Sequence, residues 1–189
     1  QIKVHGILAL ILTCEMDIPA ALRHANLAEN ALKKAGSSYL EGFARLVSSM
    51  VYYVRGDHHA GLKSGKIGMK RLCCSGYERL LGYLQGMCGL HRISLGDIRN
   101  AEEDAEYVQA IGDYYQDARL VFLGKLLQGK TARHQGKVQQ TLEGFQVQNP
   151  DDEMNIPSLL CGIEYGRQMA RLGKISEGEN QVYAVLEYS

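Results

Sequence analysis

Residues 124–131 match a nucleotide-binding pattern. Gly124, Gly129, Lys130 and Thr131 satisfy G-x4-G-K-T, in which backbone amides cradle a phosphate and the hydroxyl contacts a magnesium ion. Such a loop needs a strand before it and a helix after it, within a parallel sheet. The residues that follow contain no apolar strand ending in an acidic metal ligand. We therefore interpret the match as a glycine inside a helix.

Cys88 and His91 stand three residues apart, as two zinc ligands on one helix face would. A structural zinc site needs two such pairs, and no second pair occupies an equivalent place in the sequence. No Ser, His and Asp grouping suits nucleophilic catalysis. The acidic run 102–104 with Glu106 is interpreted as a solvated helix face. We predict a core cysteine, surface histidines, no metal, no cofactor and no catalytic residue, so the chain is not expected to be an enzyme.

Small residues recur along the chain at a fixed interval. Three segments carry Gly-x6-Gly, and two upstream segments carry weaker copies. The pairs are Ala9 and Met16, Ser49 and Gly56, Gly89 and Gly96, Gly129 and Gly136, and Gly166 and Gly173. The second members are spaced by 40 residues three times and then by 37. A period of this size indicates a solenoid of stacked repeats.

Each repeat is predicted to contain two helices with a turn at the second small residue. In the third repeat, apolar residues recur at helical spacing, Gly96 would end the first helix and Asp97 would cap the next. That next helix is expected to end at Ile111, before Gly112-Asp113. Alternating strand patterns are absent. The predicted helices cover 2–15, 18–35, 38–55, 57–74, 77–95, 97–111, 114–134, 137–147, 157–172 and 174–187.

The small residues have a packing reason. Two antiparallel helices approach closely only where neither carries a bulky side chain at the crossing point. The first small residue of each pair is expected to face a partner five residues past the turn. These partners are Ala21, Gly61, Ala101, Thr141 and Gly178.

Composition limits the possible functions. The net charge is zero and 46% of the residues are hydrophobic, so neither bulk nucleic-acid attraction nor a membrane segment is indicated. The five cysteines are irregularly spaced, and we expect most of them to be buried, reduced thiols of a cytoplasmic protein. We predict one helical-repeat domain over 1–189, with repeats near 1–36, 37–76, 77–113, 114–152 and 153–189. Because the chain begins at Gln1, we expect it to be part of a longer protein.

The arrangement resembles the tetratricopeptide repeat, with a small residue, a glycine and an alanine at fixed positions. The strings LLQGKTARHQGK and EYGRQMARLGK are similar to the longer repeats of the superhelical sensor domains in large LuxR-type bacterial transcriptional activators, such as the maltose activator. Repeats of the kinesin light chain and of peptide-sensing Gram-positive regulators are also similar. The resemblance implies an all-α, right-handed superhelix of about five antiparallel helix pairs. Phe145 and Val182 depart from the pattern, because small residues are expected there.

The resemblance also implies that the first helices line a concave surface that binds a partner. Carried over to this sequence, its apolar and aromatic part is Phe43, Met50, Tyr53, Tyr83 and Met87, and its basic part is Lys130, Arg133, Arg167 and Arg171. The apolar residues could equally belong to the core. The four cations share helix faces in adjacent repeats and could receive an acidic or phosphate-bearing group. Alternatively, each points into solvent or pairs with an acid such as Glu164.

The sequence thus predicts a non-enzymatic interaction or sensor domain in the cytoplasm that belongs to a transcriptional regulator. It would bind a peptide, a protein partner or a small effector, without direct contact to nucleic acid or membrane. The alternative is a structural scaffold segment that mediates assembly within or between molecules, with self-association left open.

Overall fold

The structure, a computed structural model, describes residues 1–32, 35–145 and 156–187. The described residues form α-helices and no strand, which confirms the all-α prediction. They group into two compact units, Gln1–Asn100 and Ala101–Ser189. The predicted extension of the eighth helix to residue 147 and part of the predicted helix 18–35 lie outside the described residues.

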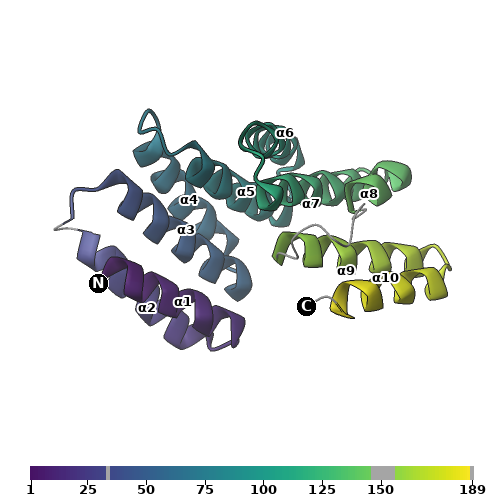
Figure 1. Cartoon of the computed structure of the whole chain (residues 1–189), viewed down its shortest axis with the longest axis horizontal. Helices are drawn as coiled ribbons and strands as arrows, with labels where there is room; N and C mark the ends of the chain where they lie inside the picture. Colours follow the sequence, from purple (N-terminus) through teal and green to yellow (C-terminus); the bar gives the residue numbers. More distant parts are fainter. Residues whose placement is uncertain (33–34, 146–155, 188–189) are drawn as a thin grey trace. The chain divides into compact units, whose positions relative to one another are not determined.

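Within each unit, helices that are neighbours in the sequence pack as antiparallel pairs (Figure 1). The first unit contains α1 (Ile2–Cys14), α2 (Ile18–Ala31), α3 (Ser38–Arg55), α4 (His58–Leu72) and α5 (Glu78–Ser94). The second contains α7 (Ala118–His134), α8 (Val138–Phe145), α9 (Ile156–Arg171) and α10 (Ile175–Glu187), and the boundary between the units falls inside α6 (Ile98–Tyr115). The pairs are α1 with α2, α3 with α4, α7 with α8 and α9 with α10. In the first unit α3 packs on both α1 and α2, and α5 packs on α3 and α4. In the second unit α9 packs in the same way on α7 and α8.

The turns form where the recurring small residues predict them. Gly56, Gly96, Gly136 and Gly173 have φ values of 82°, 79°, 73° and 80°, which is the left-handed conformation that glycine adopts without strain. Met16 occupies the same place in the first repeat and takes a φ of 61°. After two of these turns an aspartate caps the next helix, because Asp17 and Asp57 accept hydrogen bonds from the amides of Ala20 and Ala60.

The predicted helix crossings are present in the first, second and last repeats. Ala9 and Ala21 are fully buried in one core cluster. In the second repeat the Ser49 hydroxyl donates to the Gly61 carbonyl oxygen at 3.2 Å. In the last repeat a Cβ on Gly166 would lie 2.8 Å from the carbonyl oxygen of Gly178. The absence of side chains therefore sets how closely these helices approach.

The fourth repeat makes its crossing with different residues. A Cβ on Gly144 would lie 2.7 Å from the Cα of Gly129, and a Cβ on Gly129 would meet the ring of Phe145. Thr141, the predicted partner, is buried nearby and donates its hydroxyl to the Lys137 carbonyl. Phe145 can therefore occupy a position where the repeat pattern has a small residue, because Gly129 leaves room for its ring.

The predicted end of the sixth helix was wrong. This helix, α6, continues through Gly112 and Asp113 to Tyr115, and the chain turns at Gln116, whose φ is 51°. The backbone of α7 packs closely against Gly112, because a Cβ there would lie 2.6 Å from the backbone nitrogen of Val121. The glycine therefore serves a helix contact and does not end the helix. The cap of α7 is Asp117, which accepts from the amides of the next helical turn.

The prediction that most cysteines are buried was also wrong. Cys88 and Cys161 are buried, whereas Cys14, Cys73 and Cys74 are exposed. The three exposed thiols stand at or just after the ends of α1 and α4. None of the described helices combines the length and the apolar character needed to cross a membrane.

Candidate functional site

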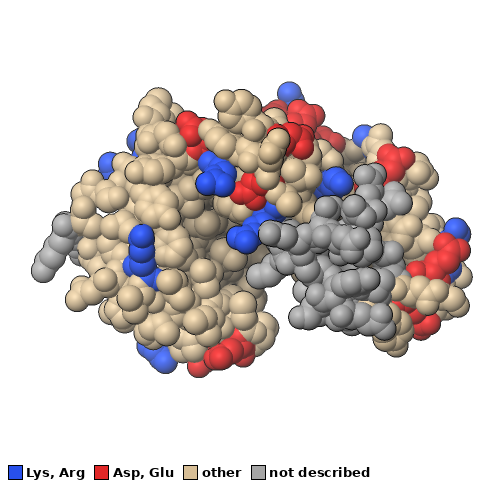
Figure 2. Space-filling view, in the orientation of Figure 1, with Lys and Arg blue, Asp and Glu red and all other residues tan. Residues whose placement is uncertain are grey.

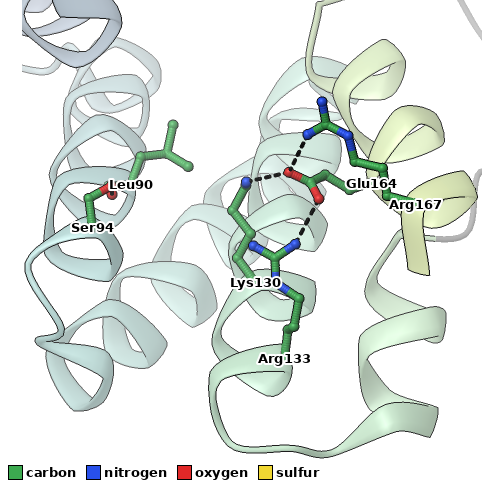
Figure 3. Close-up of polar contacts among 6 residues, drawn as sticks. All are labelled: Leu90, Ser94, Lys130, Arg133, Glu164 and Arg167. Atoms are coloured by element: carbon green, nitrogen blue, oxygen red, sulfur yellow. Dashed lines mark hydrogen bonds and ion pairs between the residues drawn. The ribbon is translucent and has the colours of Figure 1, made fainter. Parts of the chain in front are cut away.

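Four charged side chains of the second unit meet between α7 and α9 (Figure 3). Lys130 Nζ and Arg133 Nη1, one helical turn apart on α7, each lie 2.8 Å from a carboxylate oxygen of Glu164 on α9. Arg167 Nη1 lies 3.7 Å from Glu164 Oε1. Glu164 is enclosed, with 10% of its side chain exposed. One buried carboxylate thus holds cationic groups from two successive first helices in place.

The balance of charge at this site is positive. Burial raises the pKa of the Glu164 carboxyl, but the hydrogen bond and charge of Lys130, followed by those of Arg133, outweigh burial and leave the pKa below its ordinary value. Glu164 is therefore ionised at neutral pH, and it offsets one of three positive charges. A surplus of positive charge remains on this face of α7 and α9.

The surplus is accessible from solvent. The Arg167 side chain is 67% exposed, and Arg171, one turn further along α9, is exposed as well. Lys130, Arg133, Arg167 and Arg171 are called the basic wall below. The structure brings its first three members together around Glu164, which is the pairing that the sequence indicated as the alternative to a wall open to a partner. Binding of a partner there stays a prediction. On the face seen in Figure 2, both basic and acidic side chains are spread among neutral ones.

The predicted apolar part of the surface belongs to the first unit, and its residues are buried or half-buried. A Cβ on Gly6 would lie 2.5 Å from the Phe43 ring, so Phe43 fills the space between α1 and α3. Met87 is 8% exposed. Met50, Tyr53 and Tyr83 are half-buried. The alternative that these residues belong to the core is correct for Met87, and Phe43 packs against the core while partly buried.

A buried histidine is the feature that the sequence did not predict. His91 is fully buried, with Nε2 3.1 Å from the Ser49 hydroxyl and Nδ1 3.3 Å from Nδ1 of His58. The pKa of His91 is lowered to about 4, chiefly by burial and to a lesser extent by the charge of His58, while the hydrogen bond to the Ser49 backbone and the charge of Asp57 act in the opposite direction. The prediction of a surface histidine was therefore wrong for His91, although it is correct for His59.

The Ser49 and His91 pair lacks the surroundings of a catalytic site. Ser49 is fully buried and donates its hydroxyl to the Gly61 carbonyl, so no substrate can reach it. The imidazole lies where a side chain on Gly61 would stand. Ser49 and Gly61 are small residues at two facing positions. This feature of the sequence could have indicated that a buried ring fills the space between the helices.

The nucleotide-binding pattern has no structural basis. Gly124, Gly129 and Thr131 all lie within α7, where the backbone amides make helical hydrogen bonds. The interpretation of Gly129 as a helix glycine is confirmed. In the part of the chain that the structure describes, no three His, Cys, Asp or Glu side chains are grouped so that they could hold a metal ion.

A polar cavity of about 390 Å³ lies between α6 and α8 along α7. Its charged lining is Glu102, Glu106 and Glu143, and Gln135 donates to Glu102 at 2.6 Å.

The prediction that the acidic run of α6 is a solvated face was wrong for Asp104. This residue is fully buried, on the same side of the helix as the buried Ala101 and Ala105.

Comparison with protein-family models, with curated proteins and with solved structures finds no match for this chain. Its function must therefore be inferred from its own residues.

Proposed function

We propose that the chain is a non-enzymatic helical-repeat module that binds an acidic group of a peptide or protein partner on the basic wall. Paired helices, left-handed turns at a 40-residue interval and small residues at the crossings support a repeat of the tetratricopeptide type. We propose that the pairs stack into a right-handed superhelix. Such repeats act mainly as binding surfaces.

The observation that carries the proposal is the position of Glu164 among the cations of the basic wall. Lys130 and Arg133 are each held by a 2.8 Å contact, so they lose little further side-chain entropy when a ligand arrives. Arg167 extends into solvent beside them. A guanidinium group can bind a carboxylate or phosphate through two parallel hydrogen bonds, and the surplus positive charge favours an anionic ligand.

The wider role follows from the resemblance in the sequence. We propose that the module belongs to a cytoplasmic transcriptional regulator and senses a peptide, a protein partner or a small anionic effector.

Charge reversal tests the proposal. In the variant Arg167→Glu/Arg171→Glu, a fluorescently labelled oligo-glutamate peptide should lose its binding while the melting temperature stays near that of the unmodified protein. The matched control is Arg119→Glu/Lys137→Glu, which changes the charge equally at two exposed cations of the second unit that lie off the basic wall.

Binding to the unmodified protein should weaken as salt rises, because the contacts are exposed ion pairs. An oligo-glutamine peptide should not bind. Equal binding of oligo-glutamate by the two charge-reversed variants would refute the basic wall as the site.

A further inference from the structure

The geometry points to a binding site for a soft divalent cation, Zn²⁺, at the turn between α4 and α5, with Cys73 and Cys74 as its two protein ligands. These thiols are adjacent in the chain, both are exposed, and their Sγ atoms lie 3.6 Å apart. Thiolate sulfur is a preferred ligand of zinc. The inference departs from the expectation of no metal, which rested on the absence of a second ligand pair in the sequence.

The separation of the two sulfurs suits a bent metal centre. With metal–sulfur bonds of about 2.3 Å, two sulfurs 3.6 Å apart subtend an angle of about 100° at the ion, close to the tetrahedral angle. A linear dithiolate would need about 4.6 Å between its sulfurs. The pair therefore occupies two corners of a tetrahedron at its present spacing. Two corners stay open for water or for ligands of a partner.

The backbone holds the two thiols in place. Cys73, with φ −52° and ψ 125°, and Cys74, with φ 64°, have the conformations of the two central residues of a type II turn. The Ser75 amide closes the turn by donating to the Leu72 carbonyl at 3.0 Å, and the Ser75 hydroxyl donates to the same oxygen at 2.6 Å. Leu72 is 2% exposed, so the turn is anchored in the core. The two ligands therefore lose little freedom when an ion binds.

Cys74 has a conformation that cysteine seldom adopts. Among the described residues other than glycine, only Met16, Cys74 and Gln116 have a positive φ. Backbone strain of this kind is concentrated at binding and catalytic sites. Glycine would fit the turn without strain, so what Cys74 adds to the turn is its thiol.

Chelation suits the pair better than oxidation. Adjacent Cα atoms are about 3.8 Å apart, whereas an unstrained disulfide joins Cα atoms about 4.4 to 6.8 Å apart. Binding of Zn²⁺ releases the two thiol protons to solvent and leaves a neutral centre. Cys73 also follows the last residue of α4, where the final carbonyl groups of the helix favour a cation. The site is independent of the basic wall, because it belongs to the first unit.

Metal titration of the full chain in a thiol-free reductant tests the inference. Zn²⁺ should bind at one ion per chain in calorimetry, and Cd²⁺ should produce the ultraviolet charge-transfer band of thiolate-bound cadmium. Cys73→Ala and Cys74→Gly should each lower the affinity for both ions by at least about 100-fold, because a single thiolate cannot chelate. Glycine adopts a φ of 64° without strain, so Cys74→Gly keeps the turn, and circular dichroism verifies that both variants fold.

The matched control is Cys14→Ser, which removes an exposed thiol at the end of α1 and should bind both ions as the unmodified protein does. An unmodified protein that binds Zn²⁺ no more tightly than Cys74→Gly would overturn the inference. Equal weakening in Cys14→Ser would also overturn it, because the ion would then not be held by the pair. One ion for every two chains would contradict the open two-ligand site, since the thiols of two copies would then complete a closed centre.

Discussion

His91 of α5 reaches the Ser49 hydroxyl of α3 at 3.1 Å through the space that Gly61 of α4 leaves open. The Ser49 hydroxyl donates to the Gly61 carbonyl at 3.2 Å. If His91 Nε2–H donates to Ser49, its Nδ1 accepts from His58, which lies 3.3 Å away. All of these hydrogen bonds are satisfied when His91 is neutral, so the packing of three helices depends on an uncharged imidazole.

We predict that stability falls as the pH decreases from about 6.5 to about 4. The folded-state pKa of His91 is about 4, against 6.5 for an unperturbed histidine, so in this window the unfolded chain binds a proton that the folded chain does not. Unfolding is therefore favoured as the pH falls, by up to about 3 kcal/mol. Urea denaturation across the window measures the slope.

Substitution of His91 separates this effect from other titrations. His91→Asn should be less stable at neutral pH and should lose most of the slope between pH 6.5 and 4. His59→Asn, which removes an exposed neighbouring histidine, should keep the slope. An unchanged slope in His91→Asn would show that other groups cause the acid sensitivity.

Met16→Gly should stabilise the protein. Met16 has a φ of 61° where four later repeats have glycine, and its side chain is 67% exposed, so the substitution relieves backbone strain without loss of packing. The gain should be up to about 1 kcal/mol, because the left-handed conformation costs an L-residue about 1 to 2 kcal/mol while glycine loses more entropy on folding. Thermal denaturation measures the gain. Glu15→Gly, at a φ of −76°, should be destabilising, and a gain there would refute the explanation.

Gly166→Leu should cost at least about 2 kcal/mol, because overpacking outweighs the better helix propensity of leucine. A Cβ at this position would lie 2.5 Å from Val182 Cγ2 and 2.8 Å from the Gly178 carbonyl oxygen. The control is Ala170→Leu, at an exposed position of the same helix, which should change the stability little. Chemical denaturation compares the two variants, and equal stabilities would mean that α9 and α10 do not cross at Gly166.

Glu164→Gln should lower the free energy of unfolding of the second unit by about 1 to 2 kcal/mol. This is less than the cost of removing one partner of a fully buried ion pair. The change leaves Lys130 and Arg133 close together without their shared anion. Because the folded-state pKa of Glu164 is lowered, its stabilising effect is present above its unfolded pKa and is lost as the pH falls through the lowered value. Glu177→Gln, at an exposed i,i+3 pair with Lys174, should cost almost nothing. A Glu164 variant as stable as the Glu177 variant would contradict the structural role of the carboxylate.

The sequence predicts the regular features of the fold. Gly56 and Asp57 carry enough local chemistry to specify a turn and a cap, and Ser49 and Gly61 indicate a crossing through their small size. Local patterns failed where a tertiary contact decided the outcome. The sequence Gly112-Asp113 predicts a helix end, yet Gly112 lies within α6, where its missing side chain allows the backbone of Val121 to pack against it.

The candidate site was predictable only in part, for the same reason. The spacing of Lys130 and Arg133 places them on one face, but the choice of Glu164 as their shared partner depends on how α9 packs on α7. Likewise, Phe43 carries the pattern of a surface residue in the resembling repeats, and its ring packs partly buried against α1 because Gly6 has no side chain.

The most direct measurement of the central claim is an NMR titration of the isotope-labelled protein with the oligo-glutamate peptide. We predict that amide and side-chain shifts change along α7 and α9 around Lys130, Arg133 and Arg167, and that the changes disappear in Arg167→Glu/Arg171→Glu. Shift changes confined to α3 and α5 around Met50, Tyr53 and Tyr83, or no changes at all, would contradict a partner site on the basic wall.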